Sequence, residues 1–369
     1  MSRHCFLIAG EASGDMHAAH LVSALRAQCP TMTFAGVGGE KMAQAGVSLC
    51  LDYGETAFMG IVDVVRNMGR VRRNFRIVEQ ALLAAQPEVV VLIDYPSFNL
   101  RIARYCRKHL PQARVVWYIP PKVWAWKSWR VHRIAQESDL VLGIFPFEPA
   151  FYRRYGYECT YVGNPTASAL RGSRAAAPAD GEVQELVLLP GSRLSEVRHC
   201  LPVMLEAARR IANTHITVTA APGIADEHYT RLLGAGETLT RDTYEAVRKA
   251  HAAIVNSGTA TLETALLGCP QVAVYHLYAA RLLGWLRPIL QHRIFRTPYF
   301  TLVNILAGRE VIRELVANDF TADKVETEVR RLLTDRAARE DMLREYRRIE
   351  ELLGEADAPT EAARLILRI

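Results

Sequence analysis

The chain has 369 residues, of which 50% are hydrophobic and 23% charged, a composition that excludes intrinsic disorder and leaves room for about two domains. Its net charge of +6 favours anionic partners such as nucleotides, phosphorylated lipids, membrane surfaces or nucleic acid. The seven cysteines are scattered without a Cys-x-x-Cys pair, so we expect reduced thiols in a cytoplasmic protein. No apolar run approaches the roughly 18 residues of a transmembrane helix.

The first half of the chain alternates short apolar runs with longer helical patterns, which indicates βαβ units and a parallel sheet. The predicted strands of this half are residues 5–9, 33–37, 89–94, 115–119, 140–144 and 159–162. Residues 171–181, which are small, Ala-rich and Pro-containing, are typical of a domain linker.

The same pattern restarts after the linker. Further strands are predicted at residues 186–189, 216–220, 253–256 and 272–275, and from about residue 323 the sequence becomes charged and helical. The predicted fold is therefore α/β, with two Rossmann-like parallel-sheet domains facing each other across a cleft, where ligand sites are common. We expect these domains at residues 1–170 and 182–340, with the C-terminal helix at about 340–369 as a candidate to pack back on the first.

Two polar turns follow apolar strands of the first half. The amides of Gly10-Glu11-Ala12-Ser13-Gly14-Asp15 can face an anion or hydroxyl, and the alternative is a tight strand-to-helix turn with a capping Ser or Asp. Asp94 ends the strand at 89–94, where a partly desolvated carboxylate can act as a general base. Its alternative role is to fix the turn before Pro96.

Two comparable turns follow strands of the second half. In Leu189-Pro190-Gly191-Ser192-Arg193, Gly allows close approach of the backbone to a ligand and Arg can bind phosphate bidentately. In residues 256–263, turn amides can bind a diphosphate while Glu263 accepts from ribose hydroxyls, or the turn is an ordinary helix N-cap. Neither Cys/His ligand spacing nor an Asp-x-Asp pair occurs, so we expect no metal and no other cofactor.

Three segments suggest further contacts. Residues 61–77 and 278–300 mix apolar and Arg residues at helical spacing, which fits either a lipid surface or a core-packed helix with a solvated basic face. Residues 123–130 combine indoles and cations and can wall an acyl or sugar pocket or stack on bases. No DNA- or RNA-binding signature accompanies them, so we expect no nucleic-acid partner.

Nine segments in register span nearly the whole chain: GEASGD (10–15), MGIVDVV (59–65), IDYPSFN (93–99), VWAWKSWR (123–130), FPFEPAFY (145–152), YVGNP (161–165), LLPGSR (188–193), SGTATLE (257–263) and NILAGRE (304–310). Together they resemble the lipid-A-disaccharide synthase family of inverting GT-B glycosyltransferases. The resemblance implies transfer of 2,3-diacylglucosamine from UDP-2,3-diacylglucosamine to 2,3-diacylglucosamine 1-phosphate, giving the β-1,6-linked disaccharide 1-phosphate and UDP. It implies Asp94 as the base. The donor and UDP site that it implies consists of Glu11, Ser192, Arg193, Ser257, Gly258, Thr259, Glu263 and Asn304.

The resemblance also implies a peripheral enzyme at the cytoplasmic face of the inner membrane, often a homodimer. Several positions depart from the family pattern: Ser97 replaces the acid of D-x-P-D-F-N, V-S-P-S reads Ile119-Pro120-Pro121-Lys122, Asn164 replaces the His of G-H-P, and Val303 replaces the Pro before Asn304. These departures leave acyl-chain length and the acceptor head group open. The alternative functions are another UDP-sugar enzyme, such as a UDP-N-acetylglucosamine epimerase, and a membrane-associated binding protein without turnover.

Overall fold

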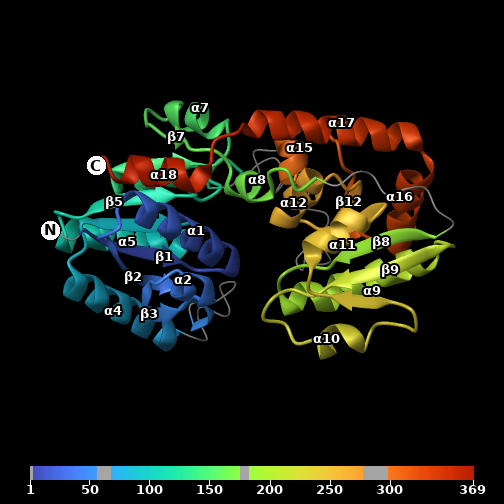
Figure 1. Ribbon diagram of the computed structural model, residues 1–369, viewed down its shortest axis with the longest axis horizontal. Helices are drawn as coiled ribbons and strands as arrows, with labels where there is room; N and C mark the ends of the chain where they lie inside the picture. Colours follow the sequence, from blue (N-terminus) through green and yellow to red (C-terminus); the bar gives the residue numbers. More distant parts are fainter. Residues whose placement is uncertain (1–2, 56–67, 126, 175–182, 277–297) are drawn as a thin grey trace. The chain divides into compact units, whose positions relative to one another are not determined.

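The computed structural model describes residues 3–55, 68–125, 127–174, 183–276 and 298–369. The chain forms two compact units, one of Met1–Ser168 with Gly354–Ile369 and the other of Ala169–Leu353. Each unit is built on one parallel sheet (Figure 1), so the predicted α/β class with two Rossmann-like sheets is confirmed. Four predicted segments lie partly outside the described residues: 61–77, 123–130, 171–181 and 278–300. The motif at 59–65 lies wholly outside them.

The first unit has a seven-stranded sheet of order β3-β2-β1-β4-β5-β6-β7. Its strands are β1 (His4–Ala9), β2 (Thr33–Gly38), β3 (Ser48–Asp52), β4 (Val89–Ile93), β5 (Arg114–Tyr118), β6 (Leu140–Gly143) and β7 (Thr160–Tyr161). The helical elements are α1 (Ala12–Gln28), α2 (Glu40–Gln44), η1 (Tyr53–Glu55), α4 (Met68–Ala85), α5 (Pro96–His109), α6 (Arg130–Gln136), α7 (Glu148–Arg153), α8 (Pro165–Leu170), which crosses the unit boundary, and α18 (Ala358–Ile366). Figure 1 shows α18 packed beside α1, from the opposite end of the chain.

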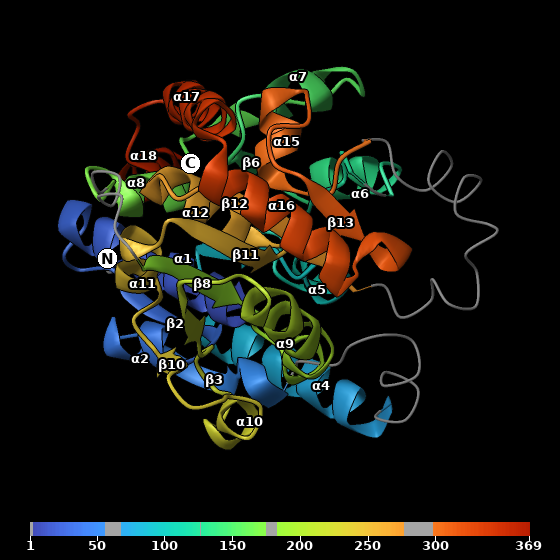
Figure 2. The same ribbon diagram turned by 90° about the vertical axis from the view of Figure 1, so that its right-hand side faces the viewer.

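The second unit has a six-stranded sheet of order β10-β9-β8-β11-β12-β13. Its strands are β8 (Gln184–Leu189), β9 (Thr214–Thr219), β10 (Thr238–Thr240), β11 (Ala252–Asn256), β12 (Gln271–Tyr275) and β13 (Glu314–Val316). The helical elements are α9 (Leu194–Arg209), α10 (Glu227–Thr230), α11 (Thr243–Lys249), α12 (Thr259–Leu267), α15 (Leu302–Ala307), η3 (Ala317–Asp319), α16 (Ala322–Thr334) and α17 (Arg336–Leu353). Helices α9 and α16 lie next to one another (Figure 2). Of the C-terminal segment, α17 thus belongs to the second unit and α18 to the first.

The central strands are continuous apolar runs because helices cover both faces of a parallel sheet. All five residues of β4 are buried, as are those of β11. Three strands were not predicted from the sequence, namely β3, β10 and β13, and each lies at the edge of its sheet. Each of the three has at most two buried residues, so it lacks the longer apolar run that marks a central strand.

Helix α4 contains the described part of the first basic amphipathic segment. Phe75 is buried in the core of the first unit and Val71 packs against that core. Arg72, Arg73 and Arg76 are exposed. For residues 68–77 the structure therefore favours the core-packed helix with a solvated basic face, and residues 61–67 lie outside the described residues.

Both sheets reverse their strand order near the middle. In the first unit the chain runs from β1 outward to β3 and returns to β4 beside β1, where Ala9 pairs with Ile93. In the second unit β11 returns beside β8, where Val255 pairs with Leu189. In open α/β sheets, ligands bind outside the carboxyl ends of the strands at such a reversal. The turns after β1, β4, β8 and β11 are thus the positions to search for a site.

Candidate functional site

Asp94 follows β4 at the reversal of the first sheet, in an unusual backbone conformation. Its φ is 43° and that of Tyr95 is 47°, so two successive non-glycine residues are left-handed. The buried Asn99 side chain stabilises this turn, since its Nδ2 donates to the carbonyls of Ile93 at 3.2 Å and Asp94 at 2.8 Å. The Asp94 amide donates to the Ile119 carbonyl at 3.0 Å. Strained backbone of this kind concentrates at functional sites, where surrounding contacts hold it in place.

The Asp94 carboxyl is both reachable and poorly hydrated. The residue is exposed at its surface, yet the protein packed around the carboxyl raises its pKa from 3.8 to about 6. The Lys122 ammonium acts in the opposite direction and lowers this pKa, whereas the Glu11 carboxylate raises it. A carboxylate with a raised pKa is a stronger base than an ordinary surface aspartate, as proton abstraction from a hydroxyl requires.

The turn after β1 lies directly beside that of β4. A Cβ on Gly10 would come within 2.3 Å of the Tyr95 ring, so only glycine allows this close approach. Glu11 is the exposed N-cap residue of α1, and its side chain makes no capping bond. Asp15 is buried instead and accepts from the amides of residues 39, 41 and 42 at the start of α2. Asp15 thus caps α2, a different helix, and Glu11 lies in the turn beside that of Asp94.

The turn after β8 is held by the carboxylate of Glu196, in the first turn of α9. Glu196 accepts from the amides of Ser192 at 3.0 Å and Arg193 at 3.3 Å, and from Nη1 of Arg193 at 3.0 Å. Gly191 has φ 118°, and a Cβ there would lie 2.4 Å from Oε2 of Glu196. This network fixes the guanidinium of Arg193 at the carboxyl edge of the second sheet.

The turn after β11 lies beside it, at the same reversal. Gly258 is the N-cap residue of α12, and among the described residues no side chain caps this helix, so the ordinary Ser or Thr cap is absent there. Ser257 and Thr259 are half-buried on either side. The Glu263 carboxyl accepts from the Tyr244 hydroxyl at 3.3 Å, and burial raises its pKa. Uncapped amides at a helix N-terminus suit an anion.

Asn304 is placed differently from the other predicted site residues. It is fully buried; its Nδ2 donates to the Ile312 carbonyl at 2.8 Å and to Glu314 at 2.9 Å. Its Oδ1 accepts from the amides of Val311 at 2.8 Å and Ile312 at 3.0 Å. This side chain therefore holds the turn that follows α15, and its polar atoms are already bonded within the protein.

The structure thus groups the predicted residues by unit. Glu11 and Asp94 lie together in the first unit, while Ser192, Arg193, Ser257, Gly258, Thr259 and Glu263 follow adjacent strands of the second. Glu196 and Tyr244, which orient two of these residues, were not predicted from the sequence. Glu196 has a local signal, an acid three residues after the N-cap. Tyr244 has none, because it reaches Glu263 from a different helix.

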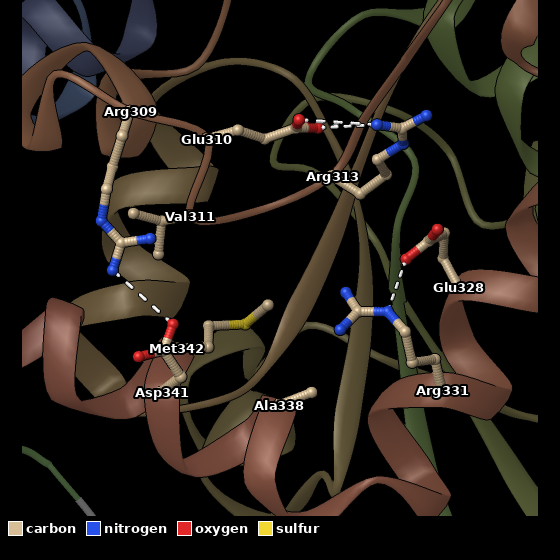
Figure 3. A pocket seen from close by; sticks show the side chains of 9 residues that line it. All are labelled: Arg309, Glu310, Val311, Arg313, Glu328, Arg331, Ala338, Asp341 and Met342. Atoms are coloured by element: carbon tan, nitrogen blue, oxygen red, sulfur yellow. Dashed lines mark hydrogen bonds and ion pairs between the residues drawn. The ribbon is translucent and has the colours of Figure 1, made fainter.

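A cavity of about 320 Å³ in the second unit contains none of these residues (Figure 3). Its arginines are each paired with a carboxylate: Arg313 with Glu310 at 3.2 Å, Arg331 with Glu328 at 3.0 Å, and Arg309 with Asp341 at 3.6 Å. These charges compensate one another, so the cavity offers no excess charge to a ligand.

In the described part of the chain, no His, Cys, Asp and Glu side chains gather as metal ligands do, and no helix has the length and apolarity to cross a bilayer.

Comparison with known proteins gives matches along the full chain. Residues 5–366 match the family model described as Lipid-A-disaccharide synthetase. The lipid-A-disaccharide synthase of Myxococcus xanthus is 38% identical over 381 residues, which cover 98% of this chain and 96% of the relative. That of Geobacter sulfurreducens is 34% identical over 382 residues, which cover 100% of this chain and 97% of the relative.

Solved structures with the same fold are more distant in sequence. The glycosyltransferase of kitacinnamycin has a TM-score of 0.66 at 12% identity and covers 100% of this chain and 99% of its own. The UDP-GlcNAc 2-epimerase from Neisseria meningitidis, solved with UDP-GlcNAc bound, has a TM-score of 0.60 at 10% identity and covers 100% of both chains. At such identities the likeness shows the fold alone, which glycosyltransferases and epimerases share.

Proposed function

The chain belongs to the lipid-A-disaccharide synthetase family, which makes it a glycosyltransferase of lipid A biosynthesis, and on this premise we propose its reaction in detail. It transfers 2,3-diacylglucosamine from UDP-2,3-diacylglucosamine to 2,3-diacylglucosamine 1-phosphate. The products are the β-1,6-linked lipid A disaccharide 1-phosphate and UDP, with inversion at the anomeric carbon. The observation that carries the residue-level proposal is Asp94, a reachable carboxyl of raised pKa at the sheet reversal of the first unit.

On the acceptor side, Asp94 is the general base. It takes the proton of the acceptor 6-hydroxyl while that oxygen bonds to the donor anomeric carbon and the bond from this carbon to the diphosphate oxygen breaks. One displacement inverts the configuration. Glu11, in the adjacent turn, supplies a second carboxylate that can accept from a sugar hydroxyl. We assign the acceptor to the domain predicted at residues 1–170.

On the donor side, we assign UDP to the domain predicted at residues 182–340. The Arg193 guanidinium, held by Glu196, and the amides of Ser257, Gly258 and Thr259 stabilise the diphosphate as it departs. Ser192 belongs to the same turn as Arg193, and the half-buried Glu263 carboxyl accepts from ribose hydroxyls. Asn304 contributes by holding the turn that follows α15, because its own polar atoms are engaged within the protein.

The proposed substrates determine where the enzyme works. Both carry acyl chains and the acceptor carries a phosphate, so the reaction takes place at a lipid surface. We assign the enzyme to the cytoplasmic face of the inner membrane as a peripheral protein. Its net charge of +6 suits an anionic surface.

Replacement of the base tests this proposal. Asp94→Asn keeps the size of the side chain but cannot accept the proton, so turnover should fall by a factor of about 10² to 10⁴ while UDP binding is retained. Asp52→Asn is the matched control, since Asp52 ends the edge strand β3 of the same sheet and accepts from the Gly54 amide. Full turnover by the Asp94→Asn enzyme would remove Asp94 from this role.

A further inference from the structure

Ionisable side chains follow four adjacent strands of the first sheet. The strand order β1-β4-β5-β6 brings the turns that carry Glu11, Asp94, Lys122 and Glu148 to one edge, since all four strands are parallel. Lys122 is the one cation of these four, and its turn lies between those of Asp94 and Glu148. The proposed mechanism uses Asp94 and Glu11 and leaves Lys122 without a role.

The backbone around Lys122 is held on both sides. Ile119, which precedes it, has φ 63°, a strained value for a β-branched residue, and its carbonyl accepts from the Asp94 amide at 3.0 Å. On the other side, the buried Trp124 donates from Nε1 to the Glu148 carboxylate at 3.1 Å. The turn of Lys122 is therefore fixed relative to both carboxylates.

The Lys122 side chain itself is exposed, and among the described residues no carboxylate lies within 4.0 Å of its ammonium. Its charge nevertheless acts on two neighbours. It lowers the pKa of Asp94, against burial and the Glu11 carboxylate, which raise that pKa. It also lowers the pKa of Glu148, which burial raises to about 7 while the amides of residues 144 and 145 and the Trp124 indole oppose that rise.

From this cluster we propose that Lys122 is a positioning residue of the transfer site, whose ammonium keeps the Asp94 carboxyl ionised and available as a base. The inference rests on the proposed function, in which Asp94 takes the acceptor proton. Lys122 is one of the positions at which this sequence departs from the V-S-P-S pattern of the family it resembles. The inference predicts that the charge of Lys122, rather than its shape, determines how acidic a medium the enzyme tolerates.

The experiment titrates Asp94 directly and follows activity in parallel. Protein labelled with ¹³C at the aspartate carboxyl carbon is titrated by NMR, with the Asp94 signal assigned from its loss in Asp94→Asn. The variants are Lys122→Met, which removes the charge, and Lys122→Arg, which retains it. Lys108→Met is the matched control, because Lys108 is an exposed lysine near the far end of α5, about 18 Å along the helix from its start. The pH dependence of kcat/KM for the acceptor is measured on the wild type and on the three lysine variants.

In Lys122→Met we expect the Asp94 pKa to rise by about half a unit, as fits an accessible cation. The acid limb of kcat/KM should move upward equally, with about twofold loss at pH 6 and none at pH 8. Lys122→Arg and Lys108→Met should titrate as the wild type. An unchanged Asp94 pKa in Lys122→Met would overturn the inference, and a raised acceptor KM in that case would assign Lys122 to acceptor binding. If the Asp94 pKa shifts while the acid limb of kcat/KM does not move, then Lys122 does act on Asp94, but Asp94 is not the base.

Discussion

The pH dependence of the transfer reaction follows from the surroundings of Asp94. The carboxylate must be ionised to accept a proton, and poor hydration raises its pKa to about 6. About one half of the molecules are then active at pH 6 and about one tenth at pH 5. An aspartate with the ordinary pKa of 3.8 would be about 94% ionised at pH 5.

The assay is kcat/KM for the acceptor, measured from pH 4.5 to 8.5 at saturating UDP donor. We expect a plateau above pH 7 and a decline that approaches tenfold per pH unit below pH 6. The Asp52→Asn control should give the same profile, because Asp52 lies at the sheet edge away from β4. An acid limb near pH 4 would refute the reasoning, since Asp94 would then be either an ordinary carboxylate or not the base.

The same surroundings predict the stability of Asp94→Asn. A pKa that is higher in the folded chain than the unfolded value of 3.8 means that folding disfavours the ionised form. The folded state therefore loses stability as the pH rises from about 4 to 6, by a small amount because Asp94 is exposed. Asp94→Asn removes this cost at pH 7.5, so its Tm should equal or exceed that of the wild type. A large fall in Tm would mean that the carboxylate stabilises the fold.

Three further substitutions test the supporting contacts. Gly191→Ala introduces both an unfavourable φ and a clash, so the free energy of unfolding should fall by about 1–3 kcal/mol and UDP binding should weaken. The control is Gly236→Ala, because Gly236 has φ 88° and no neighbour within 4 Å of the added Cβ. It should show the backbone strain alone and retain UDP affinity. Tyr244→Phe removes the 3.3 Å bond to Glu263, so steady-state kinetics should show donor KM raised by about 2- to 10-fold at similar kcat. Asp15→Asn leaves buried amides poorly matched, so urea unfolding should show a loss of about 2–3 kcal/mol.

The sequence predicts the central strands of both sheets because their apolar runs are long and buried. The edge strands β3, β10 and β13 escape such prediction. Strand β10 is a three-residue Thr-Leu-Thr segment with no fully buried position, and its pairing with β9 joins residues about twenty positions apart. Nothing local distinguishes such a segment from a loop, because the partner strand supplies the order.

The candidate site, too, is only partly predictable from the sequence. The turns after β1, β4, β8 and β11 are visible in the sequence as Gly-rich or acidic ends of apolar runs. The sequence does not show that these turns are neighbours at the two sheet reversals, which depends on strand order. Nor does it show that Asn304 is buried with its amide bonded on both sides, since those partners lie seven to ten residues further along the chain.

The most direct test of the proposed reaction is to incubate the purified protein with UDP-2,3-diacylglucosamine, with and without 2,3-diacylglucosamine 1-phosphate, and to follow UDP and the lipid products by mass. We predict UDP release that depends on the acceptor, with one disaccharide 1-phosphate formed for each UDP. UDP release without the acceptor, or no reaction by well-folded protein, would contradict the proposed substrates and mechanism.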